Sequence, residues 1–153
     1  MEIRTFQKKD LRAVVALVEK MSDYHHSLDS TYKPAKAYGD WGGIVSEWLE
    51  DPETQVFLAE EGGGVVGYIR AGVESAPEYS SEKKIGVVFD SYVEEEYRRQ
   101  GIAGELFAAA LTWFKKKKAR SIELNVDCRN EGAIALWREL GFREIKLRMR
   151  RPI

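Results

Sequence analysis

A short stretch around residue 100 combines two glycines with a change from strand character to helix character. Gly101 and Gly104 follow a β-prone run, Ile85 to Val93, and open a helical run, Ile102 to Lys118. A turn at such a junction leaves the first four N–H groups of the helix without intrahelical partners, all pointing the same way. Together with the positive end of the helix dipole, these donors suit a phosphate or pyrophosphate, and glycine lets the anion approach the backbone. We therefore expect this loop to bind the ligand.

Other phosphate-binding loops have different spacings, and the sequence argues against two of them. It contains no Gly-x-x-x-x-Gly-Lys-Ser/Thr segment, which a nucleoside-triphosphate loop requires. The Gly-x-Gly-x-x-Gly match at residues 62–67 is followed by Tyr68, Ile69 and Val73, which are apolar and β-prone. A dinucleotide-binding fold needs a helix at that point. We therefore interpret the glycines at 62–64 as the turn of a hairpin.

The spacing around residue 100 resembles the signature of the GCN5-related N-acetyltransferase family, usually called GNAT. That signature is a valine, then Arg or Gln five residues on, Gly eight on and Gly or Ala ten on, which here are Val93, Arg98, Gly101 and Ala103. A second family segment, in which a strand leads to Asn and to a helix ending in Leu-Gly-Phe, follows downstream. It matches Ile122 to Val126, Asn130, Ala133, Ala135, Leu136 and Leu140 to Phe142. The resemblance is strong from about Val87 to the C-terminus and is one of layout before that.

The resemblance implies acetyl-CoA as cosubstrate, bound where the strand carrying Val93 splays away from the strand after the long helix. The N–H of Val93 would polarise the thioester carbonyl and stabilise the oxyanion, which is worth roughly 3 to 4 kcal/mol in other enzymes. Asn130 would contact the pantetheine arm, cap its helix, or do both. The side chains of Arg98 and Arg99 could reach phosphate oxygens or pair with the acidic run 94–96. The pyrophosphate would accept hydrogen bonds from the backbone N–H groups of Arg99, Gln100, Gly101, Ile102, Ala103 and Gly104.

The reaction also needs a base, because an alkyl ammonium has a pKa of about 10.4 and must lose a proton before it attacks. Many members of the family place Glu or His four residues before the valine, where this sequence has Phe89. Asp90 is the nearest carboxylate, and Glu74 at the end of the neighbouring strand is another. Strand alternation turns Asp90 to the face opposite Val93 unless a bulge re-aims it. Asp90 is a candidate base or amine binder, with a structural carboxylate as the alternative.

A second departure from the family pattern lies in the last helix. The family often has Tyr four residues before the Gly of Leu-Gly-Phe, to protonate the departing sulfur, and here that residue is Trp137. An indole donates a hydrogen bond but is no acid. A thiol with a pKa near 8.5 is an acceptable leaving group as the thiolate. Without an acid to protonate the sulfur, catalysis could therefore be slower without being lost. Trp137 could assist the sulfur by a hydrogen bond or only fill the core.

Aromatic and histidine residues between the first two helices suggest an acceptor pocket. In the family this segment borders the acceptor, so Tyr24, His26, Tyr32 or Trp41 could shape substrate choice, with a solvated loop as the alternative. Adjacent histidines usually point apart and no carboxylate or cysteine cluster completes a ligand set, so we expect no metal site. Nothing nearby in the sequence activates Cys128 as a nucleophile.

Composition sets the remaining limits. The chain has 153 residues, a length typical of a single domain. Its net charge of −1 gives no reason to expect that it binds nucleic acid. It has no apolar run long enough for a bilayer and no signal segment, so we expect no membrane. A single cysteine cannot form an internal disulfide, which favours a cytoplasmic setting.

Hydrophobic periodicity and turn signals predict one α/β domain over residues 1–153. With the resemblance, they predict the GNAT fold: a mostly antiparallel mixed sheet of six or seven strands, splayed between the fourth and fifth and flanked by about four helices. Asp10 is expected to cap the first helix, and the segment Tyr24 to Asp40 shows no clean period. The expected strands are 1–7, 55–60, 65–73, 85–93, 121–126 and 142–149. One helix is expected to begin at Leu11, and three more are expected over 43–50, 102–118 and 131–140.

Two classes of function follow. The first is an acetyl-CoA-dependent N-acetyltransferase, in which a primary amine of a small molecule or peptide attacks the thioester directly. The second is an acyl-CoA-binding module that has lost efficient catalysis, which Phe89 and Trp137 make conceivable. Because many relatives pair through sheet edges or the last strand, we also expect a homodimer.

Overall fold

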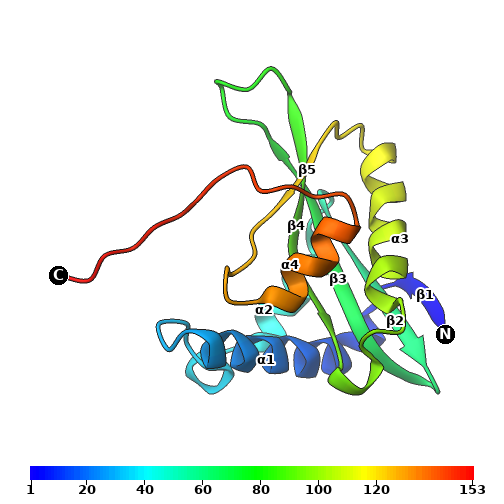
Figure 1. Ribbon diagram of the computed structural model, residues 1–153. Coiled ribbons are helices and arrows are strands. Elements are labelled where there is room, and N and C mark those ends of the chain that lie inside the picture. Colours follow the sequence, from blue (N-terminus) through cyan, green and yellow to red (C-terminus); the bar gives the residue numbers. More distant parts are fainter.

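The computed structural model describes residues 1–153 and contains one five-stranded sheet with four α-helices (Figure 1). The strands lie in the order β1-β2-β3-β4-β5; neighbours are antiparallel except β4 and β5, which are parallel. No helix combines the length and apolar character that a bilayer crossing needs. Along the chain the elements are β1 (Glu2–Thr5), α1 (Leu11–Leu28), α2 (Trp41–Glu50), β2 (Thr54–Glu61), β3 (Gly64–Ser75), β4 (Lys84–Val93), α3 (Ile102–Lys116), β5 (Ile122–Leu124) and α4 (Glu131–Glu139).

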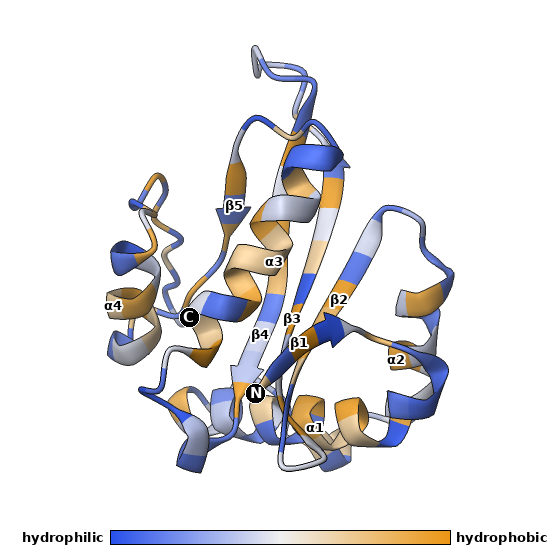
Figure 2. Cartoon of the chain, turned by 90° about the vertical axis from the view of Figure 1, so that its right-hand side faces the viewer, coloured by the Kyte–Doolittle hydropathy of each residue, from blue (hydrophilic) through white to orange (hydrophobic).

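Helices cover both faces of the sheet, and each face has its own hydrophobic core. On one face α3 lies across the strands, as Figure 2 shows, and buries Leu106 and Phe114 completely or nearly so. On the other face α1 and α2 bury Val14, Leu17 and Val45 against Leu58 and Tyr68 of the sheet. These two layers hold the central strands β3 and β4 in fixed positions.

The glycine cluster at 62–64 forms the turn of the β2–β3 hairpin, as the sequence predicts. Glu61 pairs with Gly64, and the two residues between them, Gly62 and Gly63, have φ values of 60° and 81°. Two consecutive left-handed residues make the turn that matches the twist of a hairpin. The segment is no dinucleotide loop, because a strand follows it.

The predicted last strand is wrong: residues 142–149 form no strand, so the sheet has five strands and not six or seven. The tail runs away from the body after α4 (Figure 1). Ile145, Leu147 and Met149 alternate with basic residues, but their side chains are 76%, 86% and 89% exposed. Alternation makes a strand possible, but a strand exists only where a neighbour completes its ladder, and the tail has no such neighbour.

Two local predictions also need correction. The first helix continues through Tyr24 to Leu28, a stretch whose periodicity the aromatic and histidine residues obscure. Asp10 stands at the start of that helix but does not cap it with its side chain. Its carboxylate instead accepts hydrogen bonds from the Arg4 guanidinium, at 2.7 and 2.9 Å, and from the Gln7 N–H.

Candidate active site

The parallel pairing of β4 with β5 stops halfway along β4. Only Gly86, Val87 and Val88 pair with β5, opposite Ile122, Glu123 and Leu124. Strand β4 then continues alone on that side to Val93. The two strands therefore part at Val88, which is the predicted separation of the fourth and fifth strands.

Beyond this point one edge of β4 presents backbone groups away from β3. The N–H of Glu94 donates to the Val66 carbonyl at 2.9 Å, so the intervening pair, Gly67 and Val93, is a non-hydrogen-bonded pair. The N–H and C=O of Val93 consequently point to the side that β5 has left. Ser91 lies two residues earlier and has the same orientation, because the pattern alternates along an antiparallel pair. This free edge can accept an extended chain as an additional strand.

The turn after β4 leads the same edge into the start of α3. Arg99 has a φ of 60° and Gly101 a φ of 83°, and such left-handed residues can curl successive N–H groups toward one side. No side chain caps the first turn of α3, where the first helical N–H bond runs from Glu105 to the Gly101 carbonyl. A Cβ built on Gly101 or Gly104 would meet no atom within 4 Å. The first-turn donors are therefore uncapped and unobstructed, as an anion site requires.

The side chain of Arg98 forms no ion pair with the acidic run 94–96. Its Nε donates to the Val93 carbonyl at 2.9 Å, and its guanidinium lies 5.7 Å from the Tyr24 ring centroid and 5.4 Å from that of Tyr92. Glu94, one predicted partner of Arg98, binds Lys20 instead. Arg98 thus turns back along the free edge of β4.

Asp90 lies at a bulge in β4 and is bound by an arginine of β3. Arg70 pairs with Asp90 and Ala71 with Val88, so Phe89 is the extra residue. The Arg70 Nε and Nη2 lie 2.9 and 2.7 Å from Asp90 Oδ2. Asp90 thereby faces the α1–α2 side of the sheet, whereas Val93 packs in the core under α3. The prediction that Asp90 and Val93 lie on opposite faces of the sheet is therefore confirmed.

The second oxygen of Asp90 is buried without any hydrogen-bond partner. The nearby Tyr68 hydroxyl donates to Met21 Sδ, at 3.4 Å, and it also lies close enough to the Asp90 carboxylate to act to lower the pKa of Asp90. Burial raises the pKa of Asp90, and the charge of Arg70 opposes that rise. Burial also lowers the pKa of His25, and the charges of Asp127 and Asp90 oppose that shift. A buried polar atom without a partner is uncommon and marks this carboxylate for a functional explanation.

Arg70 is itself held between two aromatic rings. Its guanidinium carbon lies 4.4 Å from the Trp48 ring centroid and 4.7 Å from that of Phe89. Gly72 makes room for Phe89, because a Cβ there would come within 2.2 Å of the Phe89 ring. Side chains from α2, β3 and β4 therefore combine to fix one arginine.

The segment after β5 contacts the end of α1. The side chain of Asn130 caps α4 by accepting from the Ala133 N–H at 3.1 Å, and the Tyr24 hydroxyl lies 3.3 Å from the same oxygen. The Tyr32 hydroxyl lies 3.4 Å from Asp127 Oδ2, and His26 Nδ1 lies 2.6 Å from the Tyr32 carbonyl. Tyr24, Tyr32 and His26 are thus brought beside the loop that carries Asn130.

Two other candidate residues lie apart from this region. Trp137 is partly buried and packs edge-on against Phe107 and Phe142, with centroids 5.9 and 5.4 Å away, beside the core under α3. Glu74 pairs with Ile85, four positions along β3 from Arg70, or about 13 Å at 3.3 Å per residue. The structure does not bring Glu74 together with Asp90. No three His, Cys, Asp or Glu side chains are grouped as metal ligands.

Reasoning from the sequence missed Ser91, Arg70 and Trp48. Ser91 lies two residues before Val93 in the same strand, so alternation gives it the same orientation. Arg70 is a basic residue in an otherwise apolar strand. A charged residue at such a position is seldom buried without a partner, and this could have singled out Arg70. No signal in the sequence pairs Trp48 with Arg70.

Comparison with known proteins identifies the family. Residues 16–142 match the model of the acetyltransferase (GNAT) family. The chain belongs to this family. An N-alpha-acetyltransferase from Sulfurisphaera tokodaii is 36% identical over 106 residues, which cover 66% of this chain and 64% of the relative. An uncharacterized N-acetyltransferase from Methanocaldococcus jannaschii is 27% identical over 143 residues, covering 93% of this chain and 60% of the relative. The chain thus spans about three fifths of the length of these two relatives.

Solved structures share the fold of this GNAT protein over its whole length. A tetramutant of the BH1408 protein from Bacillus halodurans superposes with a TM-score of 0.89 at 22% identity, covering 100% of both chains. The aminoglycoside N-acetyltransferase AAC(6')-Iy, in complex with a bisubstrate analogue of CoA and acetylneamine, gives a TM-score of 0.80 at 20% identity, covering 99% of this chain and 97% of its own.

Proposed function

We propose that this GNAT protein is an acetyl-CoA-dependent N-acetyltransferase acting by direct attack of a primary amine. One observation carries the proposal: the free edge of β4, with outward N–H groups at Ser91 and Val93, leads through the turn at residues 94–101 to the uncapped first turn of α3. An extended amide-containing arm that ends in a pyrophosphate matches this sequence of donors. The family and the CoA complex of a protein with the same fold support it.

The residues present fit coenzyme A, since Gly101 and Gly104 leave the first turn of α3 open. When bound, acetyl-CoA supplies an activated acetyl thioester. The backbone N–H groups from Arg99 to Gly104 would hold the diphosphate. The edge of β4 would hold the arm, and Arg98 would have to release the Val93 carbonyl for it. The N–H of Val93, or that of Ser91, would then stabilise negative charge on the carbonyl oxygen.

In the proposed reaction the amine nitrogen forms a bond to the acetyl carbon and the carbon–sulfur bond breaks. The amine proton passes to Asp90, whose unpartnered Oδ1 is the available acceptor, directly or through one water. The thiol leaves as thiolate, which its ordinary pKa near 8.5 permits. We assign Trp137 the role of packing α4 rather than of an acid, because of its contacts with Phe107 and Phe142.

The acceptor is proposed to be a small-molecule or peptide amine that enters from the α1–α2 side, since Asp90 faces that side. Tyr24, His26 and Tyr32 would border its path between α1 and the loop of Asn130. No step of the proposed reaction calls for a metal ion.

The test has two parts. Isothermal titration calorimetry with coenzyme A measures binding, and detection of free thiol from acetyl-CoA over a panel of polyamines, aminoglycosides, amino acids and peptides measures turnover. We expect binding together with amine-dependent thiol release. Binding without release above the hydrolysis background would favour the acyl-CoA-binding module, and absence of binding would refute both.

A further inference from the structure

His25 lies on the side of α1 that faces the sheet. It comes two helical turns after the buried Val18 and one turn after Met21, so the three side chains share one face of the helix. Met21 Sδ accepts a hydrogen bond from the Tyr68 hydroxyl, which lies close to the Asp90 carboxylate. Helix α1 contacts β3 and β4 and runs on toward the start of α4 (Figure 1). His25 is therefore placed one turn beyond the contact of α1 with Tyr68, on the face of the sheet that Asp90 occupies.

The ring of His25 also borders the loop that follows β5. Its centroid lies 5.9 Å from that of Tyr32, whose hydroxyl lies 3.4 Å from Asp127 Oδ2. The hydroxyl of the adjacent Tyr24 lies 3.3 Å from Asn130 Oδ1. Because β4 and β5 have parted before this point, a side chain between β4 and that loop lies across the opening of the two strands.

The ring nitrogens of His25 are free. Neither forms a hydrogen bond, in contrast to His26, whose Nδ1 lies 2.6 Å from the Tyr32 carbonyl. The His25 side chain is half-buried, whereas Asp90 Oδ1 is fully buried. An amine that enters from this side therefore meets an imidazole nitrogen before it meets the buried oxygen.

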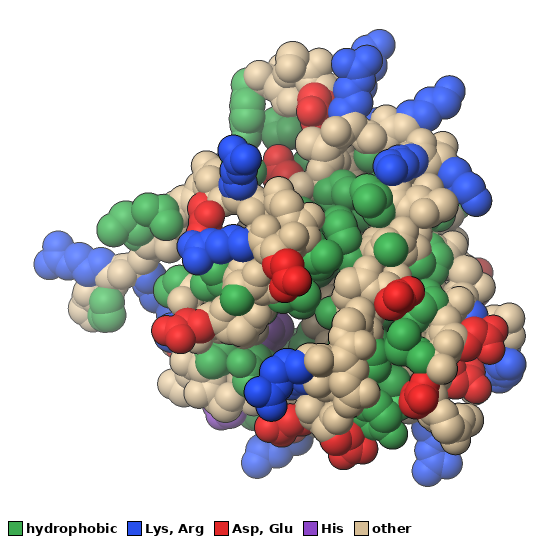
Figure 3. All heavy atoms as spheres, turned by 45° about the vertical axis from the view of Figure 1, so that its right-hand side comes forward, with side chains coloured by type: hydrophobic (Ala, Val, Ile, Leu, Met, Phe, Trp, Pro, Cys, Tyr) green, Lys and Arg blue, Asp and Glu red, His purple; other side chains and the backbone are tan.

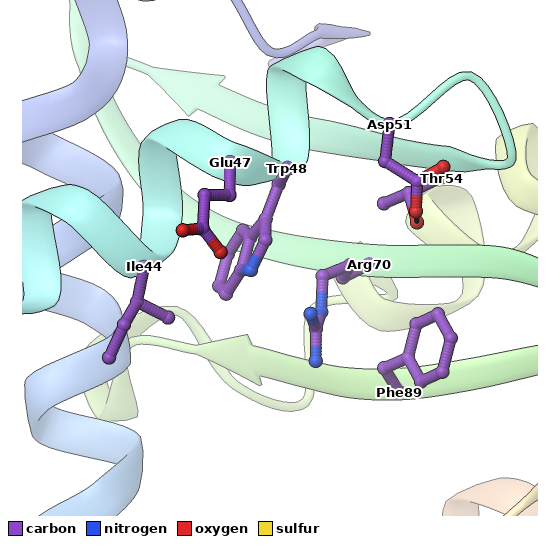
Figure 4. A pocket seen from close by; sticks show the side chains of 7 residues that line it. All are labelled: Ile44, Glu47, Trp48, Asp51, Thr54, Arg70 and Phe89. Carbon is purple, nitrogen blue, oxygen red and sulfur yellow. Dashed lines mark hydrogen bonds between the residues drawn. The ribbon is translucent and has the colours of Figure 1, made fainter.

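The pocket between α2 and the sheet gives an amine no access to Asp90. This pocket has a volume of about 390 Å³, and Figure 4 shows Arg70 and Phe89 on its strand wall opposite Trp48. Asp90 does not line the pocket, and Arg70, which does, holds Asp90 Oδ2 through Nε and Nη2. A cationic amine in the pocket would be repelled by the guanidinium. The remaining approach is from α1, where His25 lies.

Negative charges around His25 favour the protonated ring, and burial opposes it. Asp90 and Asp127 act to raise the pKa of His25, but burial has the larger effect and lowers that pKa below its ordinary value. The ring is therefore neutral at pH 7 and able to accept a proton, and the two carboxylates stabilise the cation that forms. The other titratable or charged groups around it are Tyr24, Tyr32, Arg98 over the Tyr24 ring, and Arg129, which pairs with Asp127.

Resting on the proposed acetyl transfer, we propose that His25 is the first acceptor of the amine proton on its path to Asp90. As the amine nitrogen bonds to the acetyl carbon, its N–H bond breaks and an N–H bond forms on the imidazole. The electron pair of the broken bond stays on the amine nitrogen. The imidazolium then gives a proton to Asp90 Oδ1 or to water, and the ring is neutral again for the next turnover.

The kinetic test compares wild type with His25→Asn, whose polar side chain takes up no proton, using the amine of the panel that gives the fastest thiol release. We expect kcat at pH 7 to fall about 10²-fold with the KM for acetyl-CoA unchanged. Because the variant relies on neutral amine, its kcat should rise about tenfold per pH unit, whereas the wild-type value levels off near neutral pH. Added imidazole should raise the rate of His25→Ala and not that of wild type. Glu19→Gln, an exposed carboxylate of α1 without an ion pair, should match wild type.

A titration of the ring separates this role from the acetyl transfer itself. The chain has two histidines, so NMR of the free protein can follow the His25 ring, with His26→Asn to assign the signals. We expect Asp90→Asn to lower the pKa of His25, because it removes a negative charge that favours the imidazolium.

The two measurements fail in different ways. Absence of thiol release from wild type, together with the shift in Asp90→Asn, would refute the acetyl transfer and still support the pairing of His25 with Asp90. Thiol release that His25→Asn leaves unchanged, a loss in His25→Ala that imidazole does not restore, or an unaltered pKa of His25 in Asp90→Asn would overturn the role of His25.

Discussion

Arg70 binds only one of the two carboxylate oxygens of Asp90, because its Nε and Nη2 both contact Oδ2, at 2.9 and 2.7 Å. The side chains of Arg70 and Asp90 are 24% and 11% exposed, so most of the charge of each lies away from water. The rings of Trp48 and Phe89 fix the guanidinium, and the bulge at Phe89 sets the position of the carboxylate. The pair therefore orients Asp90 and leaves Oδ1 without a partner.

Replacing Arg70 should destabilise the protein, because it leaves a buried carboxylate without its cation. For Arg70→Met we expect a loss of about 3 to 5 kcal/mol in the free energy of unfolding, with a smaller loss for Arg70→Lys. Urea unfolding at pH 7 measures it. Arg12→Met, an exposed arginine of α1 without an ion pair, serves as the control and should change stability little.

The loss in Arg70→Met should also depend on pH. Burial already raises the folded-state pKa of Asp90 above its unfolded value, and removing Arg70 raises it further. Protonation of Asp90 therefore favours the folded state, so this contribution is present at low pH and is lost as the pH rises through the folded pKa. Unfolding between pH 4 and 8 should show Arg70→Met approaching wild type at the acidic end. A loss that is the same at every pH would contradict this account of Asp90.

Asp90→Asn should remove the base while keeping the shape of the site. We expect kcat to fall about 10²- to 10⁴-fold with little change in the KM for acetyl-CoA. Because the variant depends on amine that is already neutral, its rate should rise about tenfold per pH unit below the amine pKa of about 10.4. A pH–rate profile of thiol release checks this. A variant with wild-type kcat at pH 7 would leave Asp90 a structural carboxylate.

Gly104→Glu should weaken the binding of coenzyme A without harming the fold. The space around a Cβ at Gly104 is open, and removing glycine from a helix gains up to about 1 kcal/mol. The new carboxylate would stand in the first turn of α3, where it repels a diphosphate, so we expect at least a tenfold rise in Kd by calorimetry. Gly132→Glu places the same change in the first turn of α4, also in open space, and should leave Kd unchanged.

The C-terminal tail should mediate pairing with a second copy of the chain. It projects from the body with hydrophobic and basic side chains (Figure 3), and β5 has a neighbour only on the side of β4. The alternation of Ile145, Leu147 and Met149 suits a strand added to such an edge. We expect light scattering to give a dimer for the full chain and a monomer for Leu147→Glu, while Arg148→Gln stays dimeric. A monomeric full chain, or a dimeric Leu147→Glu, would refute this role.

The sequence by itself determined the elements whose signals are local. The glycines at 62–64 specify a hairpin turn, Asn130 specifies the start of α4, and the spacing from Val93 to Ala103 specifies the turn into α3. Each depends on backbone conformations and N–H groups within a few residues, which a single stretch of sequence records.

Tertiary structure alone decided which distant side chains meet. Arg70 and Asp90 are 20 residues apart, and only the register of β3 and β4, with its bulge at Phe89, places them together. The same holds for Trp48 over Arg70, which are 22 residues apart in the sequence. The tail shows the converse, because its alternating pattern suits a strand but no strand of the sheet pairs with it. Pairing depends on which backbones become adjacent, and adjacency is a property of the folded chain rather than of any segment.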